Sequence, residues 1–315
     1  MTLKTNSWLR QFGILGMNRR NAEYIMRLNP RSSFPLVDDK LMTKRLAETH
    51  QIPTPPLYHV IDYHGDIAGL EKVLSEHQDF VVKPARGAGG NGIVLITDHQ
   101  ASSFIKPSGE ALSWTDLTYH IFDILSGVYS LEGLEDRALI EAFIHPDPIF
   151  AAVTYYGVPD IRIIVYRGVP VMGMVRLPTQ ESDGKANLHQ GAIGVGVNIK
   201  DGTTSTAVHH SMVITHHPDT GHLLSDIQVP YWKKMLHIAA RASDMTGFGY
   251  LGVDMVIDRQ RGPLLLELNA RPGLQIQVAN QKGLWGRLEL IDQAPPVIYP
   301  SPEDRVEWAI QTFTA

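Results

Sequence analysis

The sequence contains no cysteine, and this absence excludes two kinds of site at once. Neither a disulfide framework nor a thiolate-ligated metal centre can form in the 315 residues. Long apolar runs are also missing, because no stretch is long enough to span a bilayer and the first seven residues carry no apolar signal core. We therefore expect a cytoplasmic protein with no membrane partner.

Charge of either sign is sparse and mixed along the chain. The 28 basic and 33 acidic side chains give a formal net charge of -5, and neither sign forms a long run. Three isolated basic pairs are interpreted as solvated surface: Arg19-Arg20, Lys44-Arg45 and Lys233-Lys234. Nucleic acid is therefore not expected as the main partner. A hydrophobic content of 43% at this length is typical of an enzyme with one large or several smaller cores.

Periodicity and turn residues divide the chain into four parts of an α+β fold. We expect a helical N-terminal segment over 1–37, two α+β subdomains over 38–148 and 149–300, and a C-terminal helix over 301–315. Further predictions are helices over 8–28, 67–78, 231–245 and 275–286, a hairpin of 161–167 with 170–177 around Gly168, and a Gly/Asn-rich loop over 178–205.

A glycine-rich segment follows an apolar strand that carries Lys83 near its end. Its glycines are Gly87, Gly89, Gly90 and Gly92. A dinucleotide-binding fold needs a helix directly after such glycines, whereas here the β-rich run Ile93–Thr97 follows. Protein kinases also use a glycine hairpin, but their HRD and DFG tripeptides are absent, and so is a Walker A lysine. We expect a hairpin over nucleotide phosphates, with a hairpin that binds no ligand as the alternative.

A second hairpin gathers acidic and amide oxygens. If Arg259–Gly262 form a four-residue turn, the expected pairs are Asp258–Pro263, Val256–Leu265 and Asp254–Glu267. Because side chains alternate along a strand, Asp254, Glu267 and Asn269 fall on one face, and the leucines that flank Glu267 point into the core. These oxygens suit Mg²⁺, with Mn²⁺ as the second choice. A polar, solvated edge hairpin is the alternative.

In this order, the motifs resemble the ATP-grasp superfamily, and within it the α-L-glutamate ligases related to the ribosomal-protein glutamate ligase. The resemblance covers about residues 36–290 and rests on Lys83 with the glycine hairpin, Glu141, Asp160-Ile161-Arg162, Arg176, Asn187–Gly191, Asp254 and Glu267-Leu268-Asn269. It implies two α+β subdomains that grip ATP in a cleft. It also implies that a carboxylate is converted to an acyl phosphate, from which an amine displaces phosphate to give an amide.

The resemblance assigns roles to single residues. For ATP it implies phosphate contacts from Lys40 and Lys83, an adenine contact from Glu141, and adenine-edge contacts from the backbones of Phe143 and Ile144. It further implies that Asp147 contacts the ribose and that Asn187 contacts the nucleotide. Arg162 and Arg176 would bind the transferred phosphoryl group, and Arg271 would bind a substrate carboxylate. The implied metal ligands are Asp254, Glu267 and Asn269. A helix-start surface residue is the alternative for Lys40.

Two features depart from this family. Its ligases usually carry a full α/β domain before the grasp, whereas about 35 residues precede Asp38 here, so we expect acceptor recognition to differ or to come from another chain. The hinge reads Glu141-Ala142 where many relatives have two polar residues, which puts the ribose contact in question.

The expected function is an ATP-dependent carboxylate–amine ligase that adds glutamate or a related amino acid to a carboxylate acceptor, such as a protein or peptide tail. A non-ligating ATP-binding regulatory protein and an ATP-grasp phosphotransferase are the alternatives, and a homo-oligomer is compatible with the sequence. The Thr/Ser/Pro-rich stretch with His209, His210, His216 and His217 lacks one-face spacing and is interpreted as a solvated loop, not as a zinc site.

Overall fold

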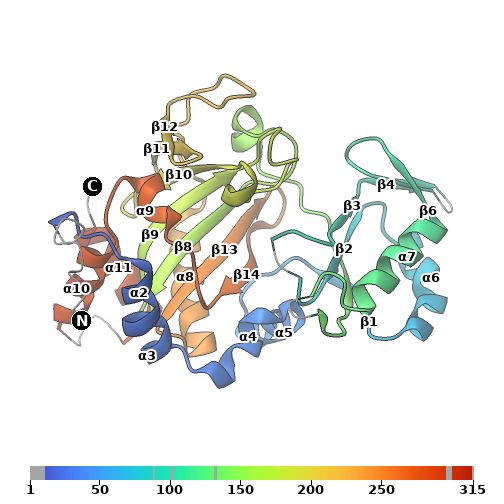
Figure 1. The fold of residues 1–315 in the computed structure, drawn as a ribbon, viewed down its shortest axis with the longest axis horizontal. Coiled ribbons are helices and arrows are strands. Elements are labelled where there is room, and N and C mark those ends of the chain that lie inside the picture. The colour runs from blue at the N-terminus through green and yellow to red at the C-terminus, as the bar shows by residue number, and fades with distance from the viewer. Residues whose placement is uncertain (1–10, 88, 101–102, 131–132, 296–299, 314–315) are drawn as a thin grey trace, which may run out of the picture. The chain divides into compact units, whose positions relative to one another are not determined.

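The computed structural model describes all residues except 1–10, 88, 101–102, 131–132, 296–299 and 314–315 (Figure 1). The chain forms two compact units. Unit 1 contains Met1–Asp38, Arg45–Pro53 and Pro146–Ala315, and unit 2 contains Asp39–Lys44 and Thr54–His145. Helix α5 (Lys40–Thr49) therefore contributes its first residues to unit 2 and its remainder to unit 1.

Unit 2 is built on an antiparallel sheet with the strand order β1-β7-β2-β3 and carries a second sheet of order β4-β5-β6. Its elements are β1 (Leu57–Ile61), a 3-10 helix (His64–Gly69), α6 (Leu70–Ser75), β2 (Phe80–Pro84), β3 (Val94–Ile96), β4 (Asp98–Gln100), β5 (Ser103–Ile105), β6 (Ala111–Ser113), α7 (Trp114–Leu125) and β7 (Ala138–Glu141). All residues of β2 and β7 are buried, because these strands lie at the centre of the sheet. Their last polar residues, Lys83 and Glu141, are buried with them.

Unit 1 is built on a seven-stranded antiparallel sheet with the order β12-β11-β10-β9-β8-β13-β14. Its strands are β8 (Asp160–Tyr166), β9 (Val169–Leu177), β10 (Ile193–Val197), β11 (Thr204–His209), β12 (Met212–Ile214), β13 (Tyr250–Asp258) and β14 (Gly262–Asn269). Its later helices are a 3-10 helix (Pro148–Val153), a 3-10 helix (Leu188–Gln190), α8 (Trp232–Thr246), α9 (Gln275–Asn280), α10 (Trp285–Gln293) and α11 (Pro302–Thr312). The hairpin predicted around Gly168 is β8–β9, and the helix predicted over 231–245 is α8.

Two glycines show that α8 and α9 cover opposite faces of this sheet. A Cβ on Gly173 of β9 would lie 2.6 Å from Trp232 of α8, whereas one on Gly196 of β10 would lie 2.8 Å from the backbone of Ala279 of α9. Gly196 pairs with Met174, the neighbour of Gly173, so the two glycines face opposite sides. Each helix therefore packs directly on the backbone of the sheet where a side chain is missing.

The loop predicted over 178–205 is only partly a loop, because it contains β10 and the first residues of β11. Gly194 and Gly196 alternate with the buried Ile193, Val195 and Val197. These glycines led to the prediction of a loop. In the structure, the missing side chain of Gly196 lets α9 pack on the strand.

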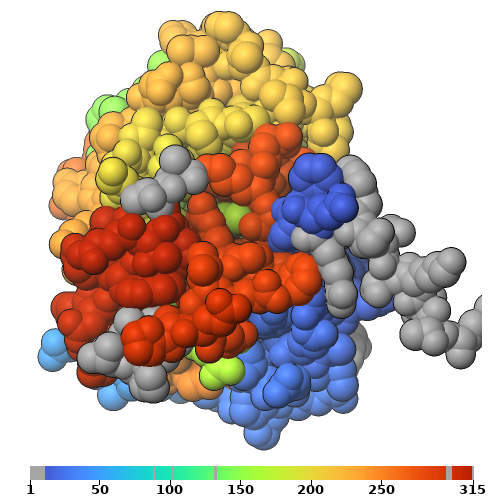
Figure 2. All heavy atoms as spheres, turned by 90° about the vertical axis from the view of Figure 1, so that its left-hand side faces the viewer, coloured from blue at the N-terminus to red at the C-terminus, as the bar shows by residue number. Residues whose placement is uncertain are grey.

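The N-terminal segment is helical from Met17 to Leu28, although the helix is not regular. It consists of α2 (Met17–Arg19), a π-helix (Arg20–Ile25) and α3 (Met26–Leu28), and a 3-10 helix (Arg31–Ser33) and α4 (Pro35–Asp38) follow. Residues 8–10 of the helix predicted over 8–28 lie outside the described residues. The amide nitrogen of Trp285 donates to Gly13 O at 2.8 Å, and Figure 2 shows this blue N-terminal segment against the orange-red segment of α10.

The helix predicted over 275–286 is interrupted. It divides into α9 and α10, and Gln281 between them has a left-handed φ of 50°. A Cβ on Gly283 would lie 2.2 Å from the backbone of Gly13, so the break also admits the N-terminal segment. In unit 2, the helix predicted over 67–78 is shorter and ends as α6 at Ser75. Among the described residues, no helix is long and apolar enough to cross a membrane.

Candidate functional site

The hairpin of β13 and β14 brings the predicted metal ligands onto one face of unit 1. The observed pairs are Asp258–Gly262, Val256–Leu264 and Asp254–Glu267. The first two differ by one residue from the predicted pairs with Pro263 and Leu265, because the turn is one residue shorter than expected. A bulge beside Asp254 absorbs the extra residue, Leu266, which is half-buried and not in the core. The predicted pairing of Asp254 with Glu267 is therefore confirmed.

Asp254 is fully buried and held by both predicted arginines. Its Oδ1 accepts a hydrogen bond from Arg162 Nε at 2.6 Å, and its Oδ2 accepts from Nη2 of Arg162 and, at 2.9 Å, from Nη2 of Arg176. Arg176 also donates two hydrogen bonds to Asp160, its partner across β8 and β9. Two-pronged contacts of this kind fix the plane of each guanidinium. The structure thus brings Arg162, Arg176 and Asp254 together.

Burial and the arginines act in opposite directions on the two aspartates. Burial alone would raise the pKa of Asp254, but the charges of Arg162 and Arg176 outweigh it and hold this pKa below its usual range. Burial raises the pKa of Asp160 to about 7, and the nearby charge of Asp254 adds to the increase, although Arg176 opposes it. Of the two carboxyls, Asp254 is the one that stays ionised.

Glu267 and Asn269 supply the oxygens on this face that are only partly buried. Asn269 Oδ1 accepts a hydrogen bond from the backbone N–H of Arg271 at 2.9 Å. A carboxylate and an amide oxygen beside an ionised Asp254 are ligands that fit a hard divalent cation. Both oxygens of the fully buried Asp254 already accept from arginines, so Glu267 and Asn269 are the more accessible of the three predicted ligands.

Lys83 and Glu141 form a buried ion pair in unit 2, together with a residue that the sequence analysis placed on the surface. Lys83 Nζ lies 2.7 Å from Glu141 Oε2, and Lys44 Nζ lies 3.2 Å from Glu141 Oε1. The interpretation of Lys44 as solvated surface is wrong, since it is only 8% exposed. Lys44 stands four residues after Lys40, a spacing that puts both on one side of a helix, and this was the available signal.

Burial lowers the pKa of Lys44 to about 8, although Glu141 opposes the shift. Glu141 Oε1 is buried, and its ion-pair partner is Lys44 Nζ at 3.2 Å. The other oxygen of Glu141 pairs with Lys83, and the adenine contact of Glu141 stays a prediction. Two ammonium groups held by one buried carboxylate fit a site for nucleotide phosphates.

The glycine segment lies next to Lys40, whose Nζ donates to Gly87 O at 2.5 Å. Gly89, Gly90 and Gly92 have φ values of 65°, 80° and 74°, which L side chains rarely adopt. A Cβ on Gly87 would also lie 2.3 Å from Pro84. A backbone that excludes side chains at these positions fits the close approach of phosphate oxygens to its N–H groups. Residue 88 within this segment lies outside the described residues.

Three other predicted residues have structural partners of their own. Asp147 caps the 3-10 helix of Pro148–Val153 by accepting from the N–H of Ile149 at 3.0 Å. Asn187 caps the 3-10 helix of Leu188–Gln190 in the same way through His189 N. Arg271 pairs at 3.2 Å with Asp38 and lies 4.8 Å above the ring of Phe34. Phe143 and Ile144 follow β7 and are half-buried.

The histidine-rich segment is not a solvated loop throughout. His209 is the last residue of β11, and His217 is 1% exposed and donates from Nε2 to Pro178 O at 3.1 Å. His209 and His210 lie around Glu181, a residue that the sequence analysis did not single out.

The family described as "Sugar-transfer associated ATP-grasp" matches residues 19–293, which include every site residue predicted from the sequence. The chain belongs to this ATP-grasp family. The α+β ATP-grasp fold and the resemblance to glutamate ligases are therefore confirmed. ATP-grasp enzymes use ATP and a divalent metal ion, which agrees with the acidic and basic groups described in the two units.

Curated relatives of this ATP-grasp chain carry a ligase name. The "Probable alpha-L-glutamate ligase" of Aeromonas salmonicida is 24% identical over 284 residues, 89% of this chain and 69% of that protein. The protein of the same name from Sodalis glossinidius is 24% identical over 267 residues, 85% of this chain and 65% of that protein. The solved "RimK domain protein ATP-grasp" from Sphaerobacter thermophilus aligns at 13% identity with a TM-score of 0.47, over 83% of this chain and 69% of that one. The chain thus spans about two thirds of the length of these relatives.

Proposed function

We propose that this chain is an ATP-dependent carboxylate–amine ligase, and that the arrangement around Asp254 carries this assignment. Arg162 and Arg176 converge on Asp254, and Glu267 lies directly opposite it. Two guanidiniums beside hard oxygen ligands supply the charge that phosphoryl transfer to a carboxylate requires. Arg162, Arg176 and Arg271 would bind negatively charged oxygens, and Asp254, Glu267 and Asn269 would bind Mg²⁺.

The reaction proceeds in two displacements. A carboxylate oxygen of the acceptor attacks the γ-phosphorus of ATP, and ADP leaves as an acyl phosphate forms. The amine of glutamate or a related amino acid then attacks the acyl carbon and expels phosphate, which leaves an amide. Lys40, Lys83 and the N–H groups of the glycine segment would hold the nucleotide phosphates, and a bound Mg²⁺ ion would supply further positive charge. The side chains of Arg162 and Arg176 neutralise the transferred phosphoryl group.

The acceptor is proposed from chemistry and from the family. A protein or peptide tail with acidic side chains presents a carboxylate. The family description names sugar transfer, so sugar acids are a second class of acceptor. Arg271, whose side chain is half-exposed beside Asp38, is the proposed contact for a substrate carboxylate.

The deciding experiment analyses products by mass spectrometry after incubation with ATP, Mg²⁺, an amino-acid mixture and either acidic peptides or uronic acids. A ligase gives an amide, ADP and phosphate in equal amounts, and hydroxylamine traps the acyl phosphate as a hydroxamate. A phosphorylated product would instead establish the phosphotransferase. ATP binding without turnover across all acceptors would favour the regulatory protein.

Lys83→Met provides the matched test of the nucleotide site. We expect it to weaken ATP binding at least tenfold in calorimetry, because Lys83 is buried beside Glu141 and the glycine segment. Lys72→Met, a change of the same kind on α6 of the same unit, serves as the control and should leave ATP binding unchanged. Equal ATP affinities of the Lys83 variant and the parent would contradict the proposed nucleotide site.

A further inference from the structure

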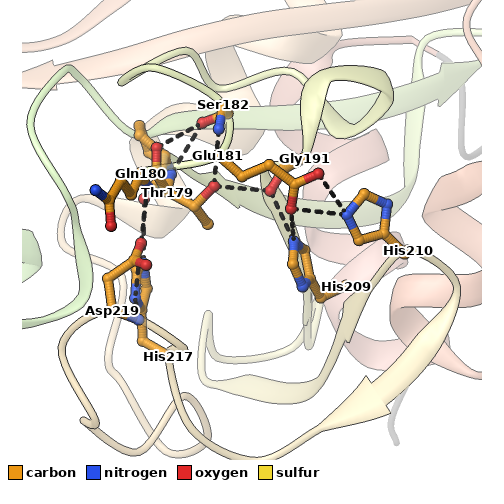
Figure 3. Close-up of polar contacts among 10 residues, drawn as sticks. Thr179, Gln180, Glu181, Ser182, Gly191, His209, His210, His217 and Asp219 are labelled. Carbon is orange, nitrogen blue, oxygen red and sulfur yellow. Dashed lines mark hydrogen bonds and ion pairs between the residues drawn. The ribbon is translucent and has the colours of Figure 1, made fainter.

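Three side chains of unit 1 converge outside the proposed ligase site, as Figure 3 shows. Glu181 lies in the segment between β9 and β10, His209 ends β11, and His210 follows it. His210 Nε2 lies 2.9 Å from each oxygen of Glu181, and His209 Nε2 lies 3.3 Å from Oε2. One ligand atom of each residue lies within 4.8 Å of the others.

We propose that Glu181, His209 and His210 bind one Zn²⁺ ion. In a tetrahedral zinc site with bonds of about 2.0–2.2 Å, neighbouring donor atoms lie about 3.3 Å apart. The observed separations of 2.9 and 3.3 Å need little adjustment. Two imidazoles and one carboxylate favour zinc and its transition-metal neighbours over Mg²⁺, which prefers oxygen ligands throughout.

Hydrogen bonds to buried side chains fix the backbone of the segment that carries Glu181. Thr179 and Ser182 flank Glu181, are buried and exchange hydrogen bonds, with Thr179 N donating to Ser182 Oγ at 2.9 Å and Ser182 N donating to Thr179 Oγ1 at 3.1 Å. Thr179 Oγ1 also donates to Gly191 O at 2.8 Å. These bonds fix the backbone beside Glu181, whose side chain is 55% exposed, so metal binding has to order the side chain alone.

Gly191 gives the cluster its room and a further oxygen. A Cβ on this glycine, whose φ is 97°, would lie 2.7 Å from Glu181 Cδ. Its carbonyl oxygen lies 2.9 Å from His209 Nε2. With the ring proton on Nε2, His209 donates to this oxygen. In the tautomer with the proton on Nδ1, the Nε2 lone pair becomes available to an ion.

The cluster is open to solvent on the side of His210. The His210 side chain is 48% exposed, and His210 lines a surface pocket of about 280 Å³ together with His189, Gln275 and Val278. An ion can therefore enter without local unfolding. Bound zinc would tie the segment that carries Asn187 and His189 to the β11–β12 hairpin.

The test measures Zn²⁺ binding to the chelator-treated full chain by calorimetry, together with thermal unfolding. The parent should bind one equivalent and show a raised melting temperature in zinc, since a ligand of the native state stabilises it. His210→Gln should lower the affinity at least tenfold and abolish the thermal shift. His222→Gln, an exposed histidine outside the cluster, should change neither.

Glu181→Gln keeps the size of the side chain but removes its charge, so it tests the site if a histidine variant fails to fold. It should also weaken zinc binding at least tenfold. A parent that binds no zinc, or a double His209→Gln, His210→Gln variant with the parent's affinity, would overturn the proposal. Neither readout depends on ligase activity.

Discussion

Asp254 shows how a single residue balances charge inside unit 1. It is fully buried, yet Arg162 and Arg176 keep it ionised, and it lies opposite Glu267 on the neighbouring strand. Replacing a buried carboxylate while its two guanidinium partners remain destabilises the fold, because both arginines then lose their counter-charge. The same residue is a proposed metal ligand, so its stability role and its binding role can be separated by measurement.

Asp254→Asn should destabilise the fold by about 3 kcal/mol, because it leaves buried guanidiniums without a full counter-charge. Urea unfolding of parent and variant measures this free energy. Asp38→Asn is the control, since Asp38 pairs with Arg271 where both side chains are roughly half-exposed, and a pair of this kind contributes at most about 1 kcal/mol. Equal losses in both variants would contradict the proposed charge balance.

Lys44 gives a prediction for pH dependence. Its pKa is lowered by burial to about 8, below the value of 10.5 in an unfolded chain. The unfolded state therefore binds more protons between these two values, so this group makes the fold more stable as the pH rises from about 8 toward 10.5. Conversely, this stabilisation is lost as the pH falls from 10.5 to about 8.

Lys44→Met should remove this dependence. The difference in unfolding free energy between parent and variant should therefore change between pH 7.5 and pH 10, in favour of the parent at the higher value. Urea unfolding at the two pH values measures it, and Lys72→Met should show no such change. If the difference in unfolding free energy is the same at both pH values, the pKa of Lys44 is not lowered in the folded protein.

At the scale of elements, the β11–β12 hairpin contains an unusual turn. His209 pairs with Met212, so His210 and Ser211 form a two-residue turn with φ values of 47° and 66°. Turns of this geometry favour Asn and Gly, and other residues pay a conformational cost there. His210 nevertheless occupies the turn, which is consistent with its proposed role as a zinc ligand.

Ser211→Gly should stabilise the protein by about 1 kcal/mol, because glycine adopts a positive φ without a clash. Ser205→Gly, within β11, is the control and should destabilise it by a similar amount, since glycine weakens a strand interior. Chemical unfolding of both variants measures the two changes. A destabilising Ser211→Gly would show that this turn is not strained.

The sequence predicted those elements whose patterns are local. Alternation and a turn were enough to place Asp254 opposite Glu267, although the bulge at Leu266 came from sheet packing and left no trace in the residues. Strand β10 was missed because it contains Gly194 and Gly196, and Gly196 is required by α9, a helix some 80 residues later in the chain. Lys44 was missed for the same reason, since its ion pair with Glu141 joins distant segments. Contacts of long sequence separation therefore account for most of what the sequence could not show.

At the scale of the whole molecule, each unit has a hydrophobic core of its own. The core of unit 2 centres on residues such as Phe80 and Ile121, and that of unit 1 runs from Leu15 to Phe313. The unit 1 core contains the N-terminal segment, whose Leu15, Tyr24 and Ile25 are buried in it. The N-terminal segment is thus an integral part of unit 1.

Asn29 joins this segment to both strands of the proposed metal hairpin. It is 2% exposed, and its Nδ2 donates to Tyr250 O at 2.6 Å and to Ala270 O at 2.9 Å, while Tyr250 N donates to its Oδ1 at 3.1 Å. These bonds connect the start of β13 with the end of β14. The polar groups that they satisfy would otherwise be buried without partners.

Asn29→Ala should therefore destabilise unit 1 by about 3 kcal/mol, because it leaves several buried backbone groups without hydrogen bonds. Hydrogen exchange followed by mass spectrometry should show faster exchange in β13 and β14, and unchanged exchange in β2 and β7, which belong to the other core. Asn21→Ala, in the same N-terminal segment, is the control, since the partner of the Asn21 side chain within the described part of the chain is the adjacent Arg20. Faster exchange in both units would instead mean that the two cores unfold together, and an unchanged β13–β14 hairpin would mean that the N-terminal segment does not hold the proposed site in place.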